Sequence, residues 1–66
     1  MTVTINGEAH ALEAPLSVRA LLERFELDPR KIAVERNLEI VPRSAYAKVE
    51  VKDGDRLEIV QFVGGG

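Results

Sequence analysis

The sequence has no cysteine, and its 66 residues include a single histidine, His10. Without thiols the chain can form no disulfide and can offer a metal no thiolate ligands. The stability of the fold must therefore come from apolar residues, which make up 45% of the chain. That share is typical of a globular domain and not of a disordered segment. At this length we expect one domain, near the lower limit for a chain that folds without covalent links.

An excess of charge of one sign is also missing, because 9 basic and 11 acidic residues give a net charge of −2. Nucleic-acid binding normally needs a basic stripe that neutralises phosphates. Here the two signs are interspersed, which predicts no nucleic-acid partner. No apolar run approaches the roughly 20 residues that span a bilayer, and the N-terminus lacks the basic-then-apolar pattern of a secretion signal. The sequence therefore predicts a cytoplasmic protein with no membrane partner.

The sequence contains no recognisable set of catalytic side chains. A nucleophilic triad needs a positioned base and a group that orients it, yet neither Ser17 nor Ser44 has an evident base in this sequence. We interpret His10 as an exposed strand residue. Asp53 and Asp55 flank a glycine, which is turn chemistry, whereas calcium takes about six to eight oxygen ligands. We therefore predict no metal site, no catalytic residue and no bound cofactor, and we do not expect the chain to be an enzyme by itself.

The first element that the sequence predicts is a β-hairpin. Val3 and Ile5 alternate with threonines, and Asn6-Gly7 follows them. This dipeptide is well suited to the positive φ angles of a two-residue type I′ turn. A second run of alternating residues, 8–12, then predicts the returning strand.

A helix is predicted after the hairpin, with Ser17 as its N-cap. Asp28-Pro29 is expected to end this helix, because proline disfavours the α conformation of the preceding residue. Between these points, apolar side chains recur at the i, i+3, i+4, i+7 spacing of one helix face. We predict that this face belongs to the core; its residues are Val18, Leu21, Leu22 and Phe25.

Three more strands are predicted in the second half of the chain. Residues 32–35 and 39–41 fold back on each other about Asn37, Tyr46 anchors the next loop, and a last strand follows the turn at Asp53-Gly54. One helix cannot cover both faces of a sheet, so a doubly wound parallel sheet is excluded. We predict an α+β fold: a mixed four- to five-stranded sheet with one helix packed across one face. With the first and last strands adjacent at the centre, this is the β-grasp, or ubiquitin-like, architecture.

The chain ends in "LEIVQFVGGG", a strand followed by three glycines. If Leu57 and Ile59 face the core, the period of two sends Val60 and Phe62 to the uncovered face. There the two side chains would form a patch that docks a partner. The alternative is that Phe62 folds over the edge of the sheet and is partly buried.

The glycines are predicted to form a flexible tail, residues 64–66, on a β-grasp domain of residues 1–63. Three extended residues span at most about 10 Å. Without β-carbons, Gly64, Gly65 and Gly66 would let a narrow cleft of another protein close around the backbone. The alternative is a frayed terminus with no role.

Over its whole length the sequence resembles the ThiS family, the sulfur carriers of thiamine biosynthesis. The shared features are "INGE", "LSVRALLERF", "IAVERNLEIVPR" and "VKDGDRLEIVQFVGGG". The combination of "IVPR", "DGD" and a terminal Gly-Gly is fairly specific. Leu38 stands where the family often has glycine, and Gly-Gly maps to Gly65 and Gly66, which makes Gly64 an additional spacer.

The resemblance implies that the carboxylate of Gly66 is the reactive group. A ThiF-like adenylating enzyme, which uses ATP and magnesium, would convert it to an acyl-adenylate. A persulfide on a sulfur donor protein would then displace AMP and leave a thiocarboxylate. A ThiG-like thiazole synthase would accept that sulfur. The chain itself would be a protein co-substrate that needs no cofactor.

Two alternatives stay open at this point. The small subunit of molybdopterin synthase (MoaD-like) shares the fold, the Gly-Gly end and the activation chemistry. Those subunits tend to be longer, and "NLEIVPR" looks more like the thiamine branch. The other alternative, from a different class, is a non-covalent β-grasp interaction module whose tail has no function.

Overall fold

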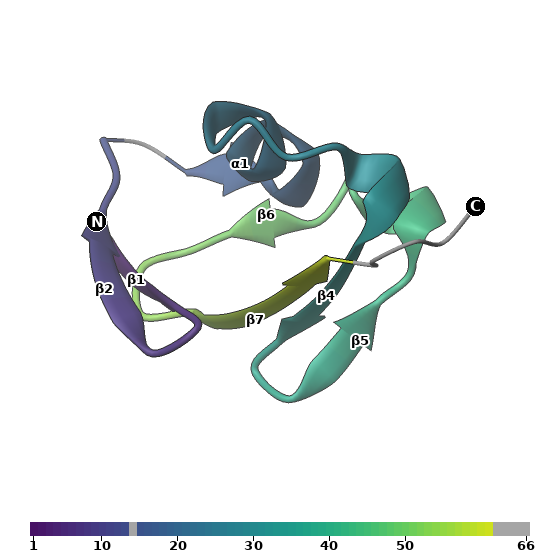
Figure 1. Cartoon of the computed structure of the whole chain (residues 1–66). Helices are drawn as coiled ribbons and strands as arrows, with labels where there is room; N and C mark the ends of the chain where they lie inside the picture. The colour runs from purple at the N-terminus through teal and green to yellow at the C-terminus, as the bar shows by residue number, and fades with distance from the viewer. Residues whose placement is uncertain (14, 62–66) are drawn as a thin grey trace.

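The computed structural model describes residues 1–13 and 15–61 (Figure 1). Within these ranges a five-stranded sheet has the order β2-β1-β7-β4-β5, and a two-stranded sheet pairs β3 with β6. The elements are β1 Thr2–Ile5, β2 Glu8–Ala11, β3 Leu16–Ser17, α1 Val18–Arg24, β4 Ile32–Arg36, β5 Glu39–Val41, β6 Glu50–Val51 and β7 Arg56–Gln61, with 3₁₀ turns η1 Pro29–Lys31 and η2 Arg43–Ala45.

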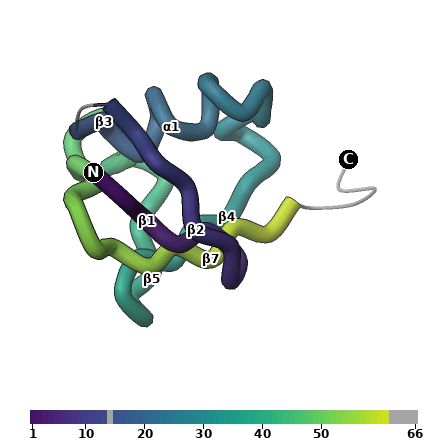
Figure 2. The backbone as a smooth tube through the Cα atoms, turned by 90° about the vertical axis from the view of Figure 1, so that its left-hand side faces the viewer, coloured from purple at the N-terminus to yellow at the C-terminus, as the bar shows by residue number. Residues whose placement is uncertain are grey.

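The first and last strands lie side by side at the centre of the large sheet. They run parallel, with Thr4 opposite Arg56 and Ile5 opposite Leu57. The other pairs of this sheet are antiparallel. Of the described elements, α1 crosses one face of the sheet and none covers the other, which we call the open face (Figures 1 and 2). The predicted β-grasp architecture is therefore confirmed.

The β1–β2 hairpin turns at Asn6-Gly7, as predicted, with φ angles of 50° and 84°. These positive values are those of a type I′ turn, whose twist matches that of the flanking strands. The strands themselves alternate, so that Val3 and Ile5 are buried against the helix side.

The helix begins where the sequence predicted but ends earlier. Ser17 Oγ accepts a hydrogen bond from the backbone N–H of Ala20 at 3.0 Å, which makes it the N-cap. The predicted end at Asp28-Pro29 is wrong, because α1 stops at Arg24. Glu26 adopts a left-handed conformation, with φ 60°. Its N–H donates to Glu23 O and that of Leu27 to Leu22 O, which is the Schellman arrangement that closes a helix.

Asp28 begins a new element instead of ending the helix. Its Oδ1 accepts from the backbone N–H of Arg30 at 2.9 Å and so caps η1. The Arg30 guanidinium also donates to both carboxylate oxygens, at 3.1 and 3.0 Å. Hydrogen bonds from the Arg30 side chain and backbone lower the pKa of Asp28 to about 2.

Phe25 is a second correction, because it does not belong to the core. Val18, Leu21 and Leu22 are buried as predicted, but Phe25 is 37% exposed. It lies one residue past the end of α1, where the helical spacing no longer controls its direction. Its ring packs edge-to-face on His10, with 5.3 Å between the ring centroids.

The small β3–β6 sheet was not predicted, because a strand of two residues shows no periodicity. It pairs Leu16 with Val51 and Ser17 with Glu50, which ties the start of α1 to the loop before β7. The predicted anchor at Tyr46 is confirmed. Its ring is 4% exposed, and its hydroxyl donates to the backbone oxygen of Ile32 at 2.7 Å.

The core lies between α1 and the large sheet, with Tyr46 and Val51 at one end. Burial of these aliphatic side chains is the main source of stability in a chain without disulfides. The buried apolar residues are Val3, Ile5, Leu12, Val18, Leu21, Leu22, Ile32, Val34, Val41, Tyr46, Val51 and Leu57.

Asp55 is the buried polar residue among those described, with 7% exposure. Its carboxylate accepts from Lys52 N at 2.8 Å, Arg36 Nε at 2.8 Å and Asn37 Nδ2 at 3.1 Å. Burial raises the pKa of Asp55, but these hydrogen bonds together outweigh it, so the net pKa lies below its ordinary value of 3.8. Asp53 in turn accepts from Thr2 N at 2.8 Å. Both carboxylates therefore organise the turn before β7, as the sequence predicted.

The turn between β4 and β5 carries backbone strain. Asn37 and Leu38 both have positive φ, 52° and 70°, the angles of a type I′ turn that favours Asn-Gly. Leu38 is 85% exposed, so its side chain packs too little to compensate. The turn is held by Asn37, whose N–H donates to Arg56 O at 2.8 Å and whose Oδ1 accepts from Arg56 N at 2.9 Å.

We expect the substitution Asp55→Asn to lower the free energy of unfolding at neutral pH by roughly 2 kcal/mol, because charge-assisted hydrogen bonds are lost. A folded-state pKa below the unfolded value gives stability that is present above pH 3.8 and lost as the pH falls through the folded pKa. Urea unfolding should show the two proteins converging on acidification. An equal gap at all pH values would contradict this role for the charge; Asp53→Asn is the control.

We expect Leu38→Gly to stabilise the protein by roughly 0.5–1 kcal/mol, because glycine adopts positive φ without steric cost. Thermal and urea unfolding would measure the change. Glu39→Gly is the matched control, since this exposed neighbour lies in β5 and should be destabilised by the same replacement. A loss of stability in Leu38→Gly would show that the leucine side chain contributes to the fold.

Candidate functional site

The last strand, β7, determines where the C-terminal segment begins. It pairs with β4 as far as Gln61, which lies opposite Ile32. Leu57 is fully buried and Ile59 partly buried on the helix side, whereas Val60 is 59% exposed on the open face. The predicted alternation is confirmed for these residues. Phe62, Gly64, Gly65 and Gly66, the other residues of the predicted patch and tail, lie outside the described residues.

Val60 belongs to a larger apolar surface on the open face of the sheet. It lies opposite Ala33 in the β4–β7 pair, and a shallow hollow of about 120 Å³ joins both residues to Ile40. Ile40 is 77% exposed. We call Ala33, Ile40 and Val60 the open-face patch. Sequence reasoning missed Ile40, although its alternation with the buried Val41 was the signal that places it outside.

Two carboxylates border the open-face patch. Glu35 lies opposite Glu58 in the β4–β7 pair and opposite Ile40 in the β4–β5 pair. Like charges directly opposite each other on a sheet are destabilising. Among the described residues no ion pair connects either glutamate to a basic side chain. The patch is therefore an apolar surface with an acidic border, which fits a partner with apolar and basic side chains.

His10 is less exposed than predicted. Its side chain is 31% exposed and lies between Phe25 and Glu8, with 3.8 Å between Nε2 and Glu8 Oε1. The fold brings no serine to it in the described part of the chain: Ser17 Oγ caps α1, and Ser44 lies in η2. In the described residues His10 therefore contacts an aromatic ring and a carboxylate.

The described residues also bear on two further kinds of site, a metal centre and a membrane span. Residues 1–13 and 15–61 bring together no group of three His, Cys, Asp or Glu side chains that could hold a metal ion. In the same ranges no helix is both long and apolar enough to cross a bilayer. What the fold does present is an open sheet face beside the strand from which the C-terminal segment begins.

A mixed sheet with parallel central strands, one covering helix and an open face defines a ubiquitin-like β-grasp protein. The model of the ThiS family matches residues 3–66, and the chain belongs to that family. A crystal structure of a thiamine biosynthesis protein (ThiS) from Geobacter metallireducens superposes with a TM-score of 0.86, at 35% identity and over 100% of both chains.

Two curated relatives show the contexts in which such a domain occurs. The sulfur carrier protein ThiS of Bacillus subtilis is 44% identical over 50 residues, 76% of each chain. A thiazole synthase of Paramagnetospirillum magneticum is 59% identical over 66 residues, which are 100% of this chain and 20% of that protein. The chain thus spans about a fifth of the length of the thiazole synthases that it matches.

Proposed function

We propose that this chain is a sulfur carrier of thiamine biosynthesis whose reactive group is the carboxylate of Gly66. The observation that carries the proposal is a glycine-terminated segment directly after a central strand of a ThiS-family fold. That strand pairs with β4 as far as Gln61. The names of the relatives and the family favour the thiamine branch over the molybdopterin synthase subunit.

The chemistry follows from the weak electrophilicity of a carboxylate. A carboxylate oxygen of Gly66 would attack the α-phosphate of ATP on a ThiF-like adenylating enzyme, with release of pyrophosphate. The persulfide of a donor protein would then attack the acyl carbon and expel AMP. A thiol would cleave the resulting S–S bond, which leaves a thiocarboxylate on Gly66 and a disulfide on the donor. ATP and magnesium belong to the adenylating enzyme, and the chain is a co-substrate rather than an enzyme.

The sulfur acceptor that we propose is a ThiG-like thiazole synthase. Two relatives named thiazole synthase contain a region similar to this whole chain. A carrier domain and the synthase thus occur in one polypeptide, as expected of two proteins that act together. We place the reaction in the cytoplasm, where ATP and persulfide donors are available.

Docking would use the open-face patch together with Phe62, while Gly64 and Gly65 thread the cleft of the partner. The patch alone is small, so Phe62, the next residue after β7, would extend it. Glu35 and Glu58 would pair with basic side chains of the partner, which relieves their mutual repulsion. Such a surface steers the carrier and binds it, whereas the glycines carry the reactive atom.

Incubation with ATP, magnesium, the adenylating enzyme and a persulfide donor should exchange one oxygen for sulfur at Gly66. Intact-mass and peptide mass spectrometry would detect and locate the change. Deletion of Gly65 and Gly66 should abolish the exchange and leave thermal unfolding unaltered. A wild-type chain that stays unmodified with active partner enzymes would refute the carrier role and favour a non-covalent interaction module.

We expect Ile40→Asp to weaken binding to thiazole synthase by about tenfold or more, because an apolar contact is replaced by a charge beside Glu35. Stability should change by less than about 1 kcal/mol, since Ile40 is 77% exposed. Ala47→Asp adds the same charge to an exposed loop and serves as the control. Calorimetric titration measures the affinity of both variants for thiazole synthase. An affinity of Ile40→Asp equal to that of the wild type would exclude the open-face patch from the interface.

A further inference from the structure

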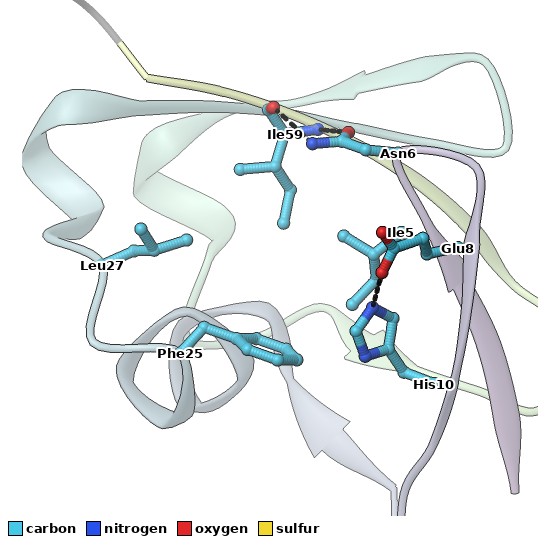
Figure 3. Close-up of a pocket in the computed structure, with 7 residues that line it drawn as sticks. All are labelled: Ile5, Asn6, Glu8, His10, Phe25, Leu27 and Ile59. Carbon is cyan, nitrogen blue, oxygen red and sulfur yellow. Dashed lines mark hydrogen bonds and ion pairs between the residues drawn. The ribbon is translucent and has the colours of Figure 1, made fainter.

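A hollow of about 280 Å³ lies between the end of α1 and the β1–β2 hairpin (Figure 3). It opens on the helix side of the sheet, so it is separate from the open-face patch. Its walls are mainly the apolar side chains of Ile5, Phe25, Leu27 and Ile59. Phe25 remains 37% exposed there. A large apolar side chain would fill this hollow and remove the surface from water.

One wall of the hollow is the edge of β7, which continues past the end of β1. β1 stops at Ile5, opposite Leu57. The side chain of Asn6 then takes the place of the next strand residue: Oδ1 accepts from Ile59 N at 2.7 Å, and Nδ2 donates to Ile59 O at 3.0 Å (Figure 3). After Asn6 the chain turns at Gly7, so β1 provides no partner for β7 beyond Ile59.

Among residues 1–13 and 15–61, the N–H and C=O of Gln61 have no partner on this edge. The bonds between Asn37 and Arg56 identify a hydrogen-bonded pair of the antiparallel β4–β7 ladder. Such pairs alternate, so residues 58 and 60 bond to β4, while residues 57, 59 and 61 point to the β1 side. On that side Leu57 O accepts from Asn6 N at 2.9 Å, and Ile59 bonds to the Asn6 amide. No hydrogen bond among the described residues reaches the Gln61 peptide there, and an unpaired strand edge is a template for strand addition.

We propose that an extended strand of thiazole synthase adds to β7 at Gln61 and inserts one large apolar side chain into the hollow. The choice of partner rests on the proposed function. The edge at Gln61 is the last position before residues 62–66, so a protein that holds those residues in a cleft lies alongside it. On an added strand, every second side chain points to the helix side of the sheet. There it lies beside Ile59, over the hollow.

The two rings that line the hollow determine which kind of inserted side chain it would favour. His10 and Phe25 meet edge-to-face at an interplanar angle of 77°, which leaves a third aromatic ring or a leucine in favourable contact with both. Glu8 lies at the rim, with 82% of its side chain exposed. A donor on the same strand, such as a tyrosine hydroxyl or a lysine, would reach this carboxylate without entering the apolar part.

The proposal can be tested by a substitution that fills the hollow with a larger side chain of this protein. His10→Trp should weaken the complex with thiazole synthase by about tenfold or more, as expected when an anchor pocket is blocked. Lys52→Trp, an exposed position in the loop before β7, should stay within about twofold of the wild type. Calorimetric titration gives the affinities, and thermal unfolding shows that both variants are folded.

Hydrogen exchange provides a second readout that needs no variant. The Gln61 amide should exchange freely in the isolated chain and at least about tenfold more slowly in the complex. Unaltered exchange of Gln61 in a formed complex, or an unaltered affinity of His10→Trp, would overturn the strand-addition proposal. Protection of Gln61 that rises with the concentration of the isolated chain would identify a second copy as the occupant and overturn it too. If the Gln61 amide is protected in the isolated chain and loses that protection when residues 62–66 are deleted, the occupant of the edge is the chain's own C-terminal segment.

These outcomes are separable from failure of the proposed function. If the wild type gains the thiocarboxylate and binds the synthase while His10→Trp binds equally well, the strand-addition proposal alone fails. If the wild type neither gains sulfur at Gly66 nor binds the synthase, the carrier role fails and the proposed occupant fails with it.

Discussion

The parallel pairing of β1 with β7 is the constraint on which the rest of the structure depends. Two parallel strands cannot be joined by a tight turn, so the chain between them must cross over the sheet. α1 makes that crossing and covers one face, while β2, β4 and β5 extend the sheet on either side. The same pairing leaves the other face open and places the last strand at the centre. Both candidate binding surfaces follow from this one arrangement.

Three polar side chains complete the central strands where the backbone cannot. Asn6 bonds to Ile59 beyond the end of β1, Asn37 bonds to Arg56 at the start of β7, and Asp55 joins the β4–β5 turn to Lys52. Each replaces a missing backbone partner with a side-chain amide or carboxylate. In a chain of 66 residues with no disulfide, such bonds fix the register of β7, and the register decides which side chains reach each face.

Features that depend on neighbouring residues could be predicted from the sequence, and those that depend on distant ones could not. The Asn6-Gly7 turn, the Ser17 cap and the alternation of Leu57 to Val60 are local signals. The end of α1 was missed because Glu26 takes a left-handed conformation that usually indicates glycine. The Asn6–Ile59 bonds connect positions 53 apart. The hollow beside β7 therefore had no sequence signal, and the predicted glycine tail lies outside the described residues.

The proposed division of roles between the glycine tail and the folded domain has an energetic rationale. Ordering a residue costs roughly 1–2 kcal/mol of backbone entropy, and glycine loses more freedom than any other residue. A tail of three glycines also contributes no side-chain contacts, so a cleft that orders it gains little in return. The folded domain must supply the binding energy. Val60 belongs to the open-face patch and Ile59 lines the hollow, so one strand offers a partner both faces within three residues of position 62. In the proposed complex, a partner that holds both faces would fix the orientation of the domain, and the glycines would then need only to extend.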